Sequence, residues 1–357
     1  MLWMAVFAGV SVLCAACLLA AGMTRRSWVF ENDVARVTRM GRVRVASVRA
    51  IIPLIGGVSR SIGYKSHPVR ISHHPVMTGL GRACVTLYRP SGADAGTLPV
   101  YVNFHGGGFI LGFPKQDDIF CRHIANHAGC VVVNADYALA PDHPFPAAIL
   151  QSYDVLKWLV SRSSDLGLDT SRLAVGGSSA GGAIAAALCL LSRERADFNI
   201  RMHVVVHGCL DFAQSFEDKH ILPARRQFLS ARDWAFCKNL YLPDARDRNM
   251  PLASPLLAKD FRGLPRALVI TAEYDVLKAE GRSYAERLRA AGVGVVYRDF
   301  PNSDHGFMYF GPKSEAIEAL DLMTAEIRDA LHGPDATVPI ARSRPLTEAA
   351  WNPQAVK

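Results

Sequence analysis

The chain has 357 residues, of which 50% are hydrophobic and 20% are charged, and its formal net charge is +8. This length and hydrophobic content favour one elaborated α/β domain over two independent ones. The positive charge accompanies no nucleic-acid-binding motif, so we expect no nucleic-acid partner. The 8 cysteines are scattered, and their spacing indicates neither a disulfide framework nor a zinc site.

The N-terminal stretch, residues 1–23, contains no charged side chain and is followed at once by Arg25 and Arg26. It is long enough to cross a bilayer. By the positive-inside rule, the basic flank predicts an uncleaved membrane anchor with the rest of the chain on the cytoplasmic face. The alternative is the signal peptide of a secreted protein, because residues 20–22 are small enough for a signal peptidase to cut.

Residues 24–81 mix arginine with valine and isoleucine without a clear period, which favours a helical cap or lid segment over a central strand. Beyond them, short apolar or β-branched runs alternate with helical stretches. Repeated strand-helix units predict a doubly wound, mostly parallel sheet flanked by helices, which we place at residues 82–332. Parallel strands are expected at 85–88, 99–104, 130–135, 172–175, 202–207, 267–271 and 294–300, and helices at 147–162, from 181 and at 314–331.

Two regions depart from this alternation. Residues 211–251 cluster charged and aromatic side chains, which favours a helical cap insertion over the sheet rather than an ordinary surface excursion. Residues 333–357 contain proline and arginine without periodicity, so we expect a flexible C-terminal tail.

A G-x-S-x-G pattern occupies residues 177–181, between an apolar run and a run of small residues. This context predicts a tight turn from a strand into a helix, with Ser179 at its centre. Glycine on both sides suits a turn too tight for a neighbouring Cβ, and the turn would lift the serine hydroxyl out of the sheet. Ser179 is therefore the candidate nucleophile.

Reactive groups in open α/β sheets gather beyond the carboxyl ends of the strands. Asp275 and His305 each follow a predicted strand, and the chain order Ser179, Asp275, His305 is the order of an α/β-hydrolase triad. In such a triad the histidine accepts the serine proton, and the acid fixes the imidazole tautomer. Asp211 and Asp304 are the alternative acids, since they also follow strands.

A glycine run follows the strand predicted at 99–104 and begins after His105. Backbone amides of Gly106, Gly107, Gly108 and Ala180 are the candidate oxyanion-hole donors, because glycine lets the backbone itself approach a substrate. We expect His105 to organise this loop through hydrogen bonds rather than to react.

His123 and His127 have the i, i+4 spacing of a helical metal-binding pair. No glutamate of an H-E-x-x-H motif lies between them, and the sequence shows no third ligand. A solvated helix face is the preferred interpretation. We therefore predict no metal.

Taken together, these motifs make the chain resemble the hormone-sensitive lipase-like family of α/β-hydrolase esterases, which also resembles arylacetamide deacetylases. The strings that carry the resemblance are His105 to Phe109, Asp136 to Ala148, Gly177 to Gly182, Tyr274 to Leu277 and His305 to Phe307. The resemblance implies a carboxylic ester hydrolase with a helical cap and no cofactor, and it supports Asp275 over Asp211 as the acid. The chain departs from the family at Ser178, where aspartate or threonine is usual, and at residues 207–211, which lack the usual tyrosine-proline pair.

These observations predict a serine carboxylesterase that hydrolyses short- to medium-chain acyl esters through an acyl-enzyme intermediate. One alternative is an amidase or deacetylase that uses the same residues. Another is a receptor on the same fold that binds a small molecule without turnover. The sequence leaves the oligomeric state open, a homodimer included.

Overall fold

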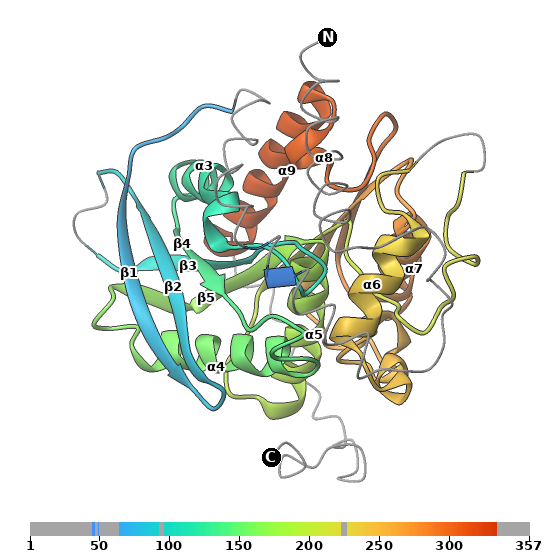
Figure 1. Ribbon diagram of the computed structural model, residues 1–357. Coiled ribbons are helices and arrows are strands. Elements are labelled where there is room, and N and C mark those ends of the chain that lie inside the picture. Colours follow the sequence, from blue (N-terminus) through green and yellow to red (C-terminus); the bar gives the residue numbers. More distant parts are fainter. Residues whose placement is uncertain (1–44, 47–48, 50–63, 93–95, 223–226, 334–357) are drawn as a thin grey trace. The chain divides into compact units, whose positions relative to one another are not determined.

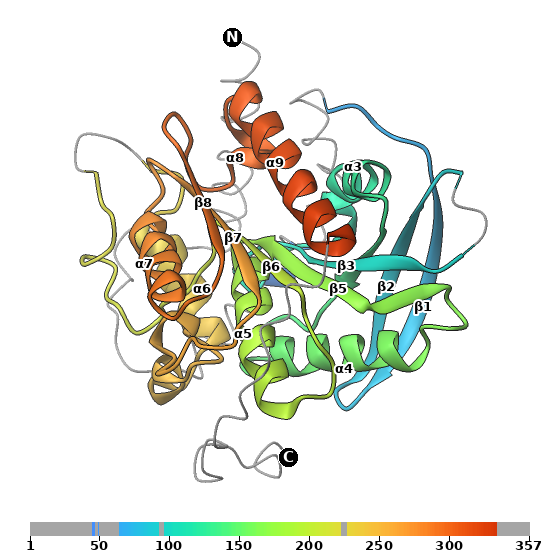
Figure 2. The ribbon, with the colours of Figure 1, turned by 180° about the vertical axis from the view of Figure 1, so that it is seen from behind.

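The computed structural model describes residues 45–46, 49, 64–92, 96–222 and 227–333. From residue 64 onward, the described residues all belong to one unit, Gly56–Lys357. An 8-stranded sheet runs through this unit with helices on both of its faces (Figures 1 and 2).

The strands follow the order β1-β2-β4-β3-β5-β6-β7-β8 across the sheet. Their bounds are β1 Val69–Thr78, β2 Gly81–Pro90, β3 Leu98–Phe104, β4 Val131–Asp136, β5 Leu168–Ser178, β6 Met202–Val206, β7 Arg266–Ala272 and β8 Val295–Phe300. From β4 to β8 all neighbours pair in parallel, whereas β1 with β2 and β2 with β4 are antiparallel. The prediction of a mostly parallel sheet is thus confirmed.

The first two strands correct two of the sequence-based expectations. Residues 69–78, placed in a helical lid segment, form the edge strand β1, and residues 85–88 lie in an antiparallel strand. A tight turn after Thr78 joins β1 to β2, and a connection this short can only join antiparallel strands. Pro75 is tolerated in β1 because an edge strand has one side without a hydrogen-bonding neighbour. Most of the remaining predicted lid lies outside the described residues.

Helices cover the parallel part of the sheet. The α-helices are α3 Asp118–Ala128, α4 Ala147–Ser161, α5 Ala180–Arg195, α6 Ala231–Tyr241, α7 Lys278–Ala290, α8 Phe307–Phe310 and α9 Lys313–His332, and the 3₁₀ helices are η2 Pro114–Asp117, η3 Ala245–Asn249 and η4 Pro255–Leu257. Helices α3 and α9 pack together on one face, and α4 and α5 lie on the other (Figure 2). The helices predicted at 147–162, from 181 and at 314–331 are confirmed.

Helix α5 lies against the middle of the sheet because its first turns carry almost no side-chain bulk. Its residues from Ala180 to Ser192 are all buried, and alanine or glycine occupies every position of the N-terminal half except Ile184. This close packing fixes the start of α5 directly beyond the end of β5. The two elements thereby position the turn at Ser179.

The predicted insertion at residues 211–251 is helical only in part. It contains α6 and the 3₁₀ helix η3, and its first half has no regular structure where it is described. Aromatic side chains connect the insertion to the loop after β3, because Phe109 of that loop stacks on Tyr241 at a ring distance of 3.8 Å and lies 6.0 Å from the Phe212 ring. The insertion is therefore packed beside the glycine run.

The membrane anchor predicted at residues 1–23 and, apart from Gly333, the tail predicted at residues 333–357 lie outside the described residues, so both stay predictions. Within the part of the chain that is described, no helix combines the length and the apolar character that a membrane span requires.

Candidate active site

Ser179 occupies the turn between the last residue of β5 and the first residue of α5. Its backbone has φ 54° and ψ −115°, in a region that residues with a Cβ rarely adopt. The strained turn is held on both sides, because the Ser179 amide donates to the Val206 carbonyl at 2.8 Å and the Ala183 amide donates to the Ser179 carbonyl at 3.2 Å. The surrounding structure thus fixes this serine in its unusual conformation.

The glycines that flank Ser179 are required by close approach of the neighbouring strand β3. A Cβ on Gly177 would lie 2.1 Å from the Phe104 carbonyl oxygen, and one on Gly181 would lie 1.9 Å from the same atom. Any larger residue would force the end of β3 away. The G-x-S-x-G pattern is therefore a packing requirement of this turn.

The structure brings Ser179, His305 and Asp275 into one hydrogen-bonded chain. His305 Nε2 lies 3.0 Å from Ser179 Oγ, and His305 Nδ1 lies 2.9 Å from Asp275 Oδ2. The other carboxylate oxygen, Asp275 Oδ1, accepts a hydrogen bond from the Leu277 amide at 2.9 Å. The arrangement can move a proton from the hydroxyl to an imidazole whose far side is held by a carboxylate.

The alternative acids have other partners. Asp211 Oδ1 accepts hydrogen bonds from the amides of Ala213 and Gln214, which makes it a local turn residue. Asp304 accepts from the backbone amides of His305 and Phe228 and so holds the histidine loop in place. Of the three acids, Asp275 is the one whose carboxylate reaches the His305 ring.

The charges around His305 favour its protonated form. Burial alone would lower the pKa of His305, but Asp275, Asp304 and Glu280 outweigh this effect and raise the pKa above its ordinary value. Burial also opposes ionisation of Asp275, yet His305 and the Leu277 amide hold the pKa of Asp275 below its ordinary value. The pair is therefore a carboxylate beside an imidazole that accepts protons readily.

The glycine run lies directly against the serine turn. A Cβ on Gly106 would be 3.6 Å from Ser179 Cβ, and Gly107 and Gly108 have positive φ values of 132° and 61°, which favour glycine. None of the amides of Gly107, Gly108 and Ala180 donates a hydrogen bond to another described residue. These backbone donors are thus available to a ligand.

His105 organises this loop, as expected. Its side chain is completely buried, Nδ1 lies 2.8 Å from the Gly106 carbonyl oxygen, and its ring stacks on Tyr137. Tyr137 in turn donates to the His105 carbonyl at 2.7 Å. None of these hydrogen bonds joins His105 to Ser179 or His305, so the role of His105 is to shape the loop.

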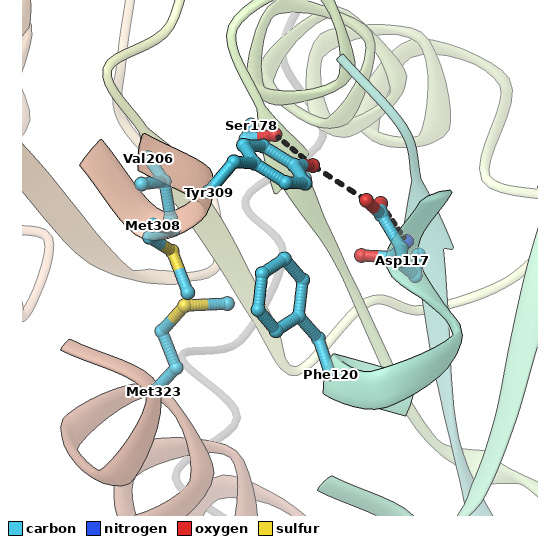
Figure 3. Close-up of a pocket in the computed structure, with 9 residues that line it drawn as sticks. Asp117, Phe120, Ser178, Val206, Met308, Tyr309 and Met323 are labelled. Carbon is cyan, nitrogen blue, oxygen red and sulfur yellow. Dashed lines mark hydrogen bonds between the residues drawn. The ribbon is translucent and has the colours of Figure 1, made fainter. Parts of the chain in front are cut away.

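A second hydrogen-bonded chain starts at Ser178 and runs behind the serine turn (Figure 3). Ser178 Oγ lies 3.3 Å from the Tyr309 hydroxyl, which donates to Asp117 Oδ1 at 2.5 Å. Asn103 Nδ2 donates to Asp117 Oδ2 at 2.8 Å. Burial, partly offset by Tyr309 and Asn103, raises the pKa of Asp117 to about 6. We call Ser178, Tyr309, Asp117 and Asn103 the rear network.

The rear network borders a cavity of about 10 Å³ between the sheet and the layer of α3 and α9 (Figure 3). This is about the room that one water molecule needs. The cavity is lined by Asn103, Asp117, Phe120, Gly177, Ser178, Val206, Met308, Tyr309 and Met323. It is too small for an organic substrate and contains none of the three groups Ser179, Asp275 and His305, so it is a packing gap behind the site.

Two residues near the site were missed by sequence reasoning. His207, which follows β6, is buried with its ring 4.6 Å from that of His305, and burial followed by the His305 charge lowers the pKa of His207 to about 3. Cys209 Sγ lies 3.6 Å from Ser179 Oγ. Both follow a strand at the carboxyl edge of the sheet, the same signal that identified Asp275. His207 is thus a neutral ring that packs against the catalytic candidate.

Exposed aromatic side chains lie beside His305. Phe228 is 47% exposed and Phe310 is 42% exposed, and their rings stack at 5.6 Å. The Phe228 ring also lies 6.5 Å from the His305 ring. Apolar surface left uncovered next to reactive polar groups is typical of a small-molecule binding site.

Two groups of three side chains within the described residues bring potential metal-ligand atoms within 4.8 Å of one another. One consists of His207, Asp275 and His305, whose last two members are already joined by a hydrogen bond. The other joins His67 to the predicted pair His123 and His127. The interpretation of that pair as a solvated face is wrong for His123, whose side chain is only 17% exposed.

A scan against protein families matches residues 101–309 to a family described as having the alpha/beta hydrolase fold. The carboxylesterase NlhH of Mycobacterium tuberculosis is 32% identical to the chain over 84% of the chain and 91% of NlhH. The carboxylic ester hydrolase LipN of the same organism is 38% identical, and the alignment spans 62% of the chain and 60% of LipN.

Solved structures agree with these sequence matches. The carboxylesterase EstE1, cloned from a metagenomic library, superposes with a TM-score of 0.75 at 31% identity, over 81% of this chain and 98% of EstE1. An esterase from Pyrobaculum calidifontis superposes with a TM-score of 0.73 at 34% identity, over 80% of this chain and 93% of that esterase. The chain belongs to the hormone-sensitive lipase-like family of α/β hydrolases.

Proposed function

We propose that this protein is a serine carboxylesterase that hydrolyses short- to medium-chain acyl esters. Ser179 is the nucleophile, His305 the general base and acid, and Asp275 the residue that orients His305. The observation that carries the proposal is the unbroken chain of hydrogen bonds from Ser179 Oγ through His305 to Asp275, at 3.0 and 2.9 Å.

In the first half-reaction, Ser179 Oγ attacks the ester carbonyl carbon while His305 Nε2 accepts the hydroxyl proton. The carbonyl oxygen becomes an oxyanion, which amides among Ala180, Gly106, Gly107 and Gly108 stabilise, each donor contributing about 3 kcal/mol in the transition state. The tetrahedral intermediate then expels the alcohol, which takes the proton from His305 Nε2. The acyl group remains on Ser179.

In the second half-reaction, His305 accepts a proton from water, whose oxygen attacks the acyl carbon. The carbon–Oγ bond breaks, the proton returns to Ser179 Oγ, and the carboxylic acid leaves. Asp275 stabilises the His305 cation in both halves without becoming protonated itself. The low pKa that His305 imposes on Asp275 supports this role.

The substrate class is inferred from the apolar surroundings and from the relatives. Phe228 and Phe310 offer exposed apolar surface beside His305. One relative, 33% identical over 68% of the chain, is named ethyl acetate hydrolase and comes from Pseudomonas putida. Another, from Saccharolobus solfataricus, is named arylesterase. These features support acyl groups of modest length.

The test is hydrolysis of p-nitrophenyl acetate, butyrate, octanoate and palmitate by the purified full chain. We expect kcat/KM to be highest between acetate and octanoate and lowest for palmitate. A maximum at palmitate would contradict the proposed chain length, and no release of p-nitrophenol from any ester would contradict the proposed activity. Faster cleavage of p-nitroacetanilide than of p-nitrophenyl acetate would favour the amidase alternative.

A further inference from the structure

Three histidines from two separate segments meet beside α3. His123 and His127 lie one turn apart on this helix, and His67 comes from the segment that leads into β1. The ring of His67 lies 5.4 Å from that of His123 and 4.5 Å from that of His127, and the two helical rings are 4.4 Å apart. The sequence could not show this meeting, because the first and last of the three are 60 positions apart.

Side chains of α3 hold the backbone at His67 in place. Arg122 Nη1 donates to the His67 carbonyl at 3.5 Å, and Asn126 Nδ2 donates to the Pro68 carbonyl at 3.1 Å. Both donors are side chains of α3, next to His123 and His127 in sequence. The position of His67 over the helical pair is therefore fixed by contacts that do not involve the imidazoles.

The spacing of the ring nitrogens suits a tetrahedral metal ion. Nε2 of His67 and Nε2 of His127 are 3.3 Å apart, and the three ligand atoms lie within 4.8 Å of one another. Ligands 2.0–2.1 Å from a tetrahedral zinc ion are about 3.4 Å apart. The pair of His67 and His127 already has this separation, and the ligand nitrogen of His123 lies within 4.8 Å of both.

A carboxylate stands beside the cluster. Asp321 Oδ1, on α9, lies 3.2 Å from His123 Nε2. Metal-bound histidines commonly have a carboxylate partner that orients the ring, and the negative charge favours a cation nearby. Neutral imidazoles are frequent ligands of divalent transition metals.

We propose that His67, His123 and His127 form a binding site for Zn²⁺, with Asp321 as the carboxylate that orients His123. The bound ion would fasten the segment before β1 to α3. This site is independent of the proposed ester hydrolysis, since none of its members belongs to the chain of Ser179, His305 and Asp275.

The test uses the full chain without a polyhistidine tag, stripped of metal by EDTA and dialysed. Calorimetry with Zn²⁺ and the visible absorption of bound Co²⁺ report binding, and the Tm reports its effect on stability. His67→Gln and His127→Gln each remove one ligand from a side chain that is not fully buried. The matched control is a double variant with His73→Gln and His74→Gln, which replaces two neighbouring histidines of the edge strand β1.

We expect the wild type and the control to bind about one Zn²⁺ per chain, to gain the tetrahedral Co²⁺ absorption bands and to melt at a higher temperature with Zn²⁺. His67→Gln and His127→Gln should lose the Co²⁺ bands and the rise in Tm while keeping the metal-free circular dichroism of the wild type. Asp321→Asn should bind about 10–100-fold more weakly.

Two results would overturn the proposal. One is a wild type that shows neither the Co²⁺ bands nor a Zn²⁺-dependent rise in Tm. The other is binding that persists in His67→Gln and blocks ester hydrolysis, which would place the ion at His207, Asp275 and His305, the other described group with suitable spacing. Loss of esterase activity in a metal-free wild type that folds normally would contradict the independence of the metal site from ester hydrolysis.

Discussion

Ser178 and Ser179 are neighbours in the chain and equally shielded, each 8% exposed, yet their hydroxyls enter different networks. Ser178 is the last residue of β5, and its side chain points into the layer of α3 and α9, where it meets Tyr309. Ser179 lies beyond the strand in a backbone conformation with positive φ, which turns its hydroxyl toward His305. The serines of the two networks are thus joined by a single peptide bond.

The comparison shows why sequence position alone does not make a serine a nucleophile. The chain of Ser179, His305 and Asp275, which we call the forward network, ends on an ionised carboxylate with a lowered pKa, and its histidine accepts protons readily. The rear network ends on Asp117, whose pKa burial raises to about 6, and it contains no imidazole. A tyrosine between a serine and a carboxylate can hold both in place, but it cannot serve as a base near neutral pH, because burial and Asp117 raise its pKa well above the ordinary value.

The largest expected effect on kcat comes from replacing Ser179. Ser179→Ala should lower kcat for p-nitrophenyl butyrate by about 10⁶-fold, because no other group can form the acyl-enzyme. Ser178→Ala is the matched control and should retain activity within about tenfold, since it removes a single neutral hydrogen bond. The opposite ranking in a kinetic comparison of the two variants would reverse the assignment of the two networks.

The next effect is on the acid of the forward network. Asp275→Asn should lower kcat by about 10⁴-fold, because the amide favours the wrong imidazole tautomer and no longer stabilises its cation. Asp211→Asn is the control, since its turn hydrogen bonds can be kept by the asparagine oxygen. Steady-state kinetics that show the larger loss for Asp211→Asn would make Asp211 the acid.

The rear network should matter for stability more than for rate. Tyr309→Phe leaves Ser178 and Asp117 without their shared partner, which should lower the free energy of unfolding by about 1–3 kcal/mol. We expect kcat to change by less than about tenfold, because the forward network keeps all its contacts. Urea unfolding and kinetics on the same preparation check both statements. An unchanged stability with a strongly reduced kcat would mean that the rear network takes part in the reaction.

The smallest effect concerns pH. His305 must be neutral to accept the serine proton, so activity is present above the pKa of His305 and is lost as the pH falls through it. Because Asp275, Asp304 and Glu280 raise this pKa, the acidic limb of kcat/KM should lie above about 6.5, the ordinary histidine value. Asp304→Asn removes one of these charges and should shift the limb to lower pH. A shift to higher pH in the pH–rate profile would contradict the charge assignment.

The parallel strands and the helices behind them were predictable because each is a continuous apolar or small-residue run bounded by turn residues. The antiparallel direction of β2 was not predictable, because a strand of such composition can pair in either direction. The tight turn after Thr78 makes β2 antiparallel to β1. The positions of Ser179, Asp275 and His305 followed from strand ends and chain order. Other contacts join residues that are far apart in sequence, and no local pattern predicts them. Examples are the hydrogen bonds of Tyr309 with Ser178 and Asp117, and the contact of His67 with His127.

The central claim is that Ser179, and not its neighbour, forms the covalent intermediate. A fluorophosphonate that phosphonylates reactive serines, followed by peptide mass spectrometry, tests this most directly. We expect one adduct, located on Ser179, present in the wild type and in Ser178→Ala and absent in Ser179→Ala. An adduct that survives in Ser179→Ala, or a folded wild type that takes no label at all, would contradict the account.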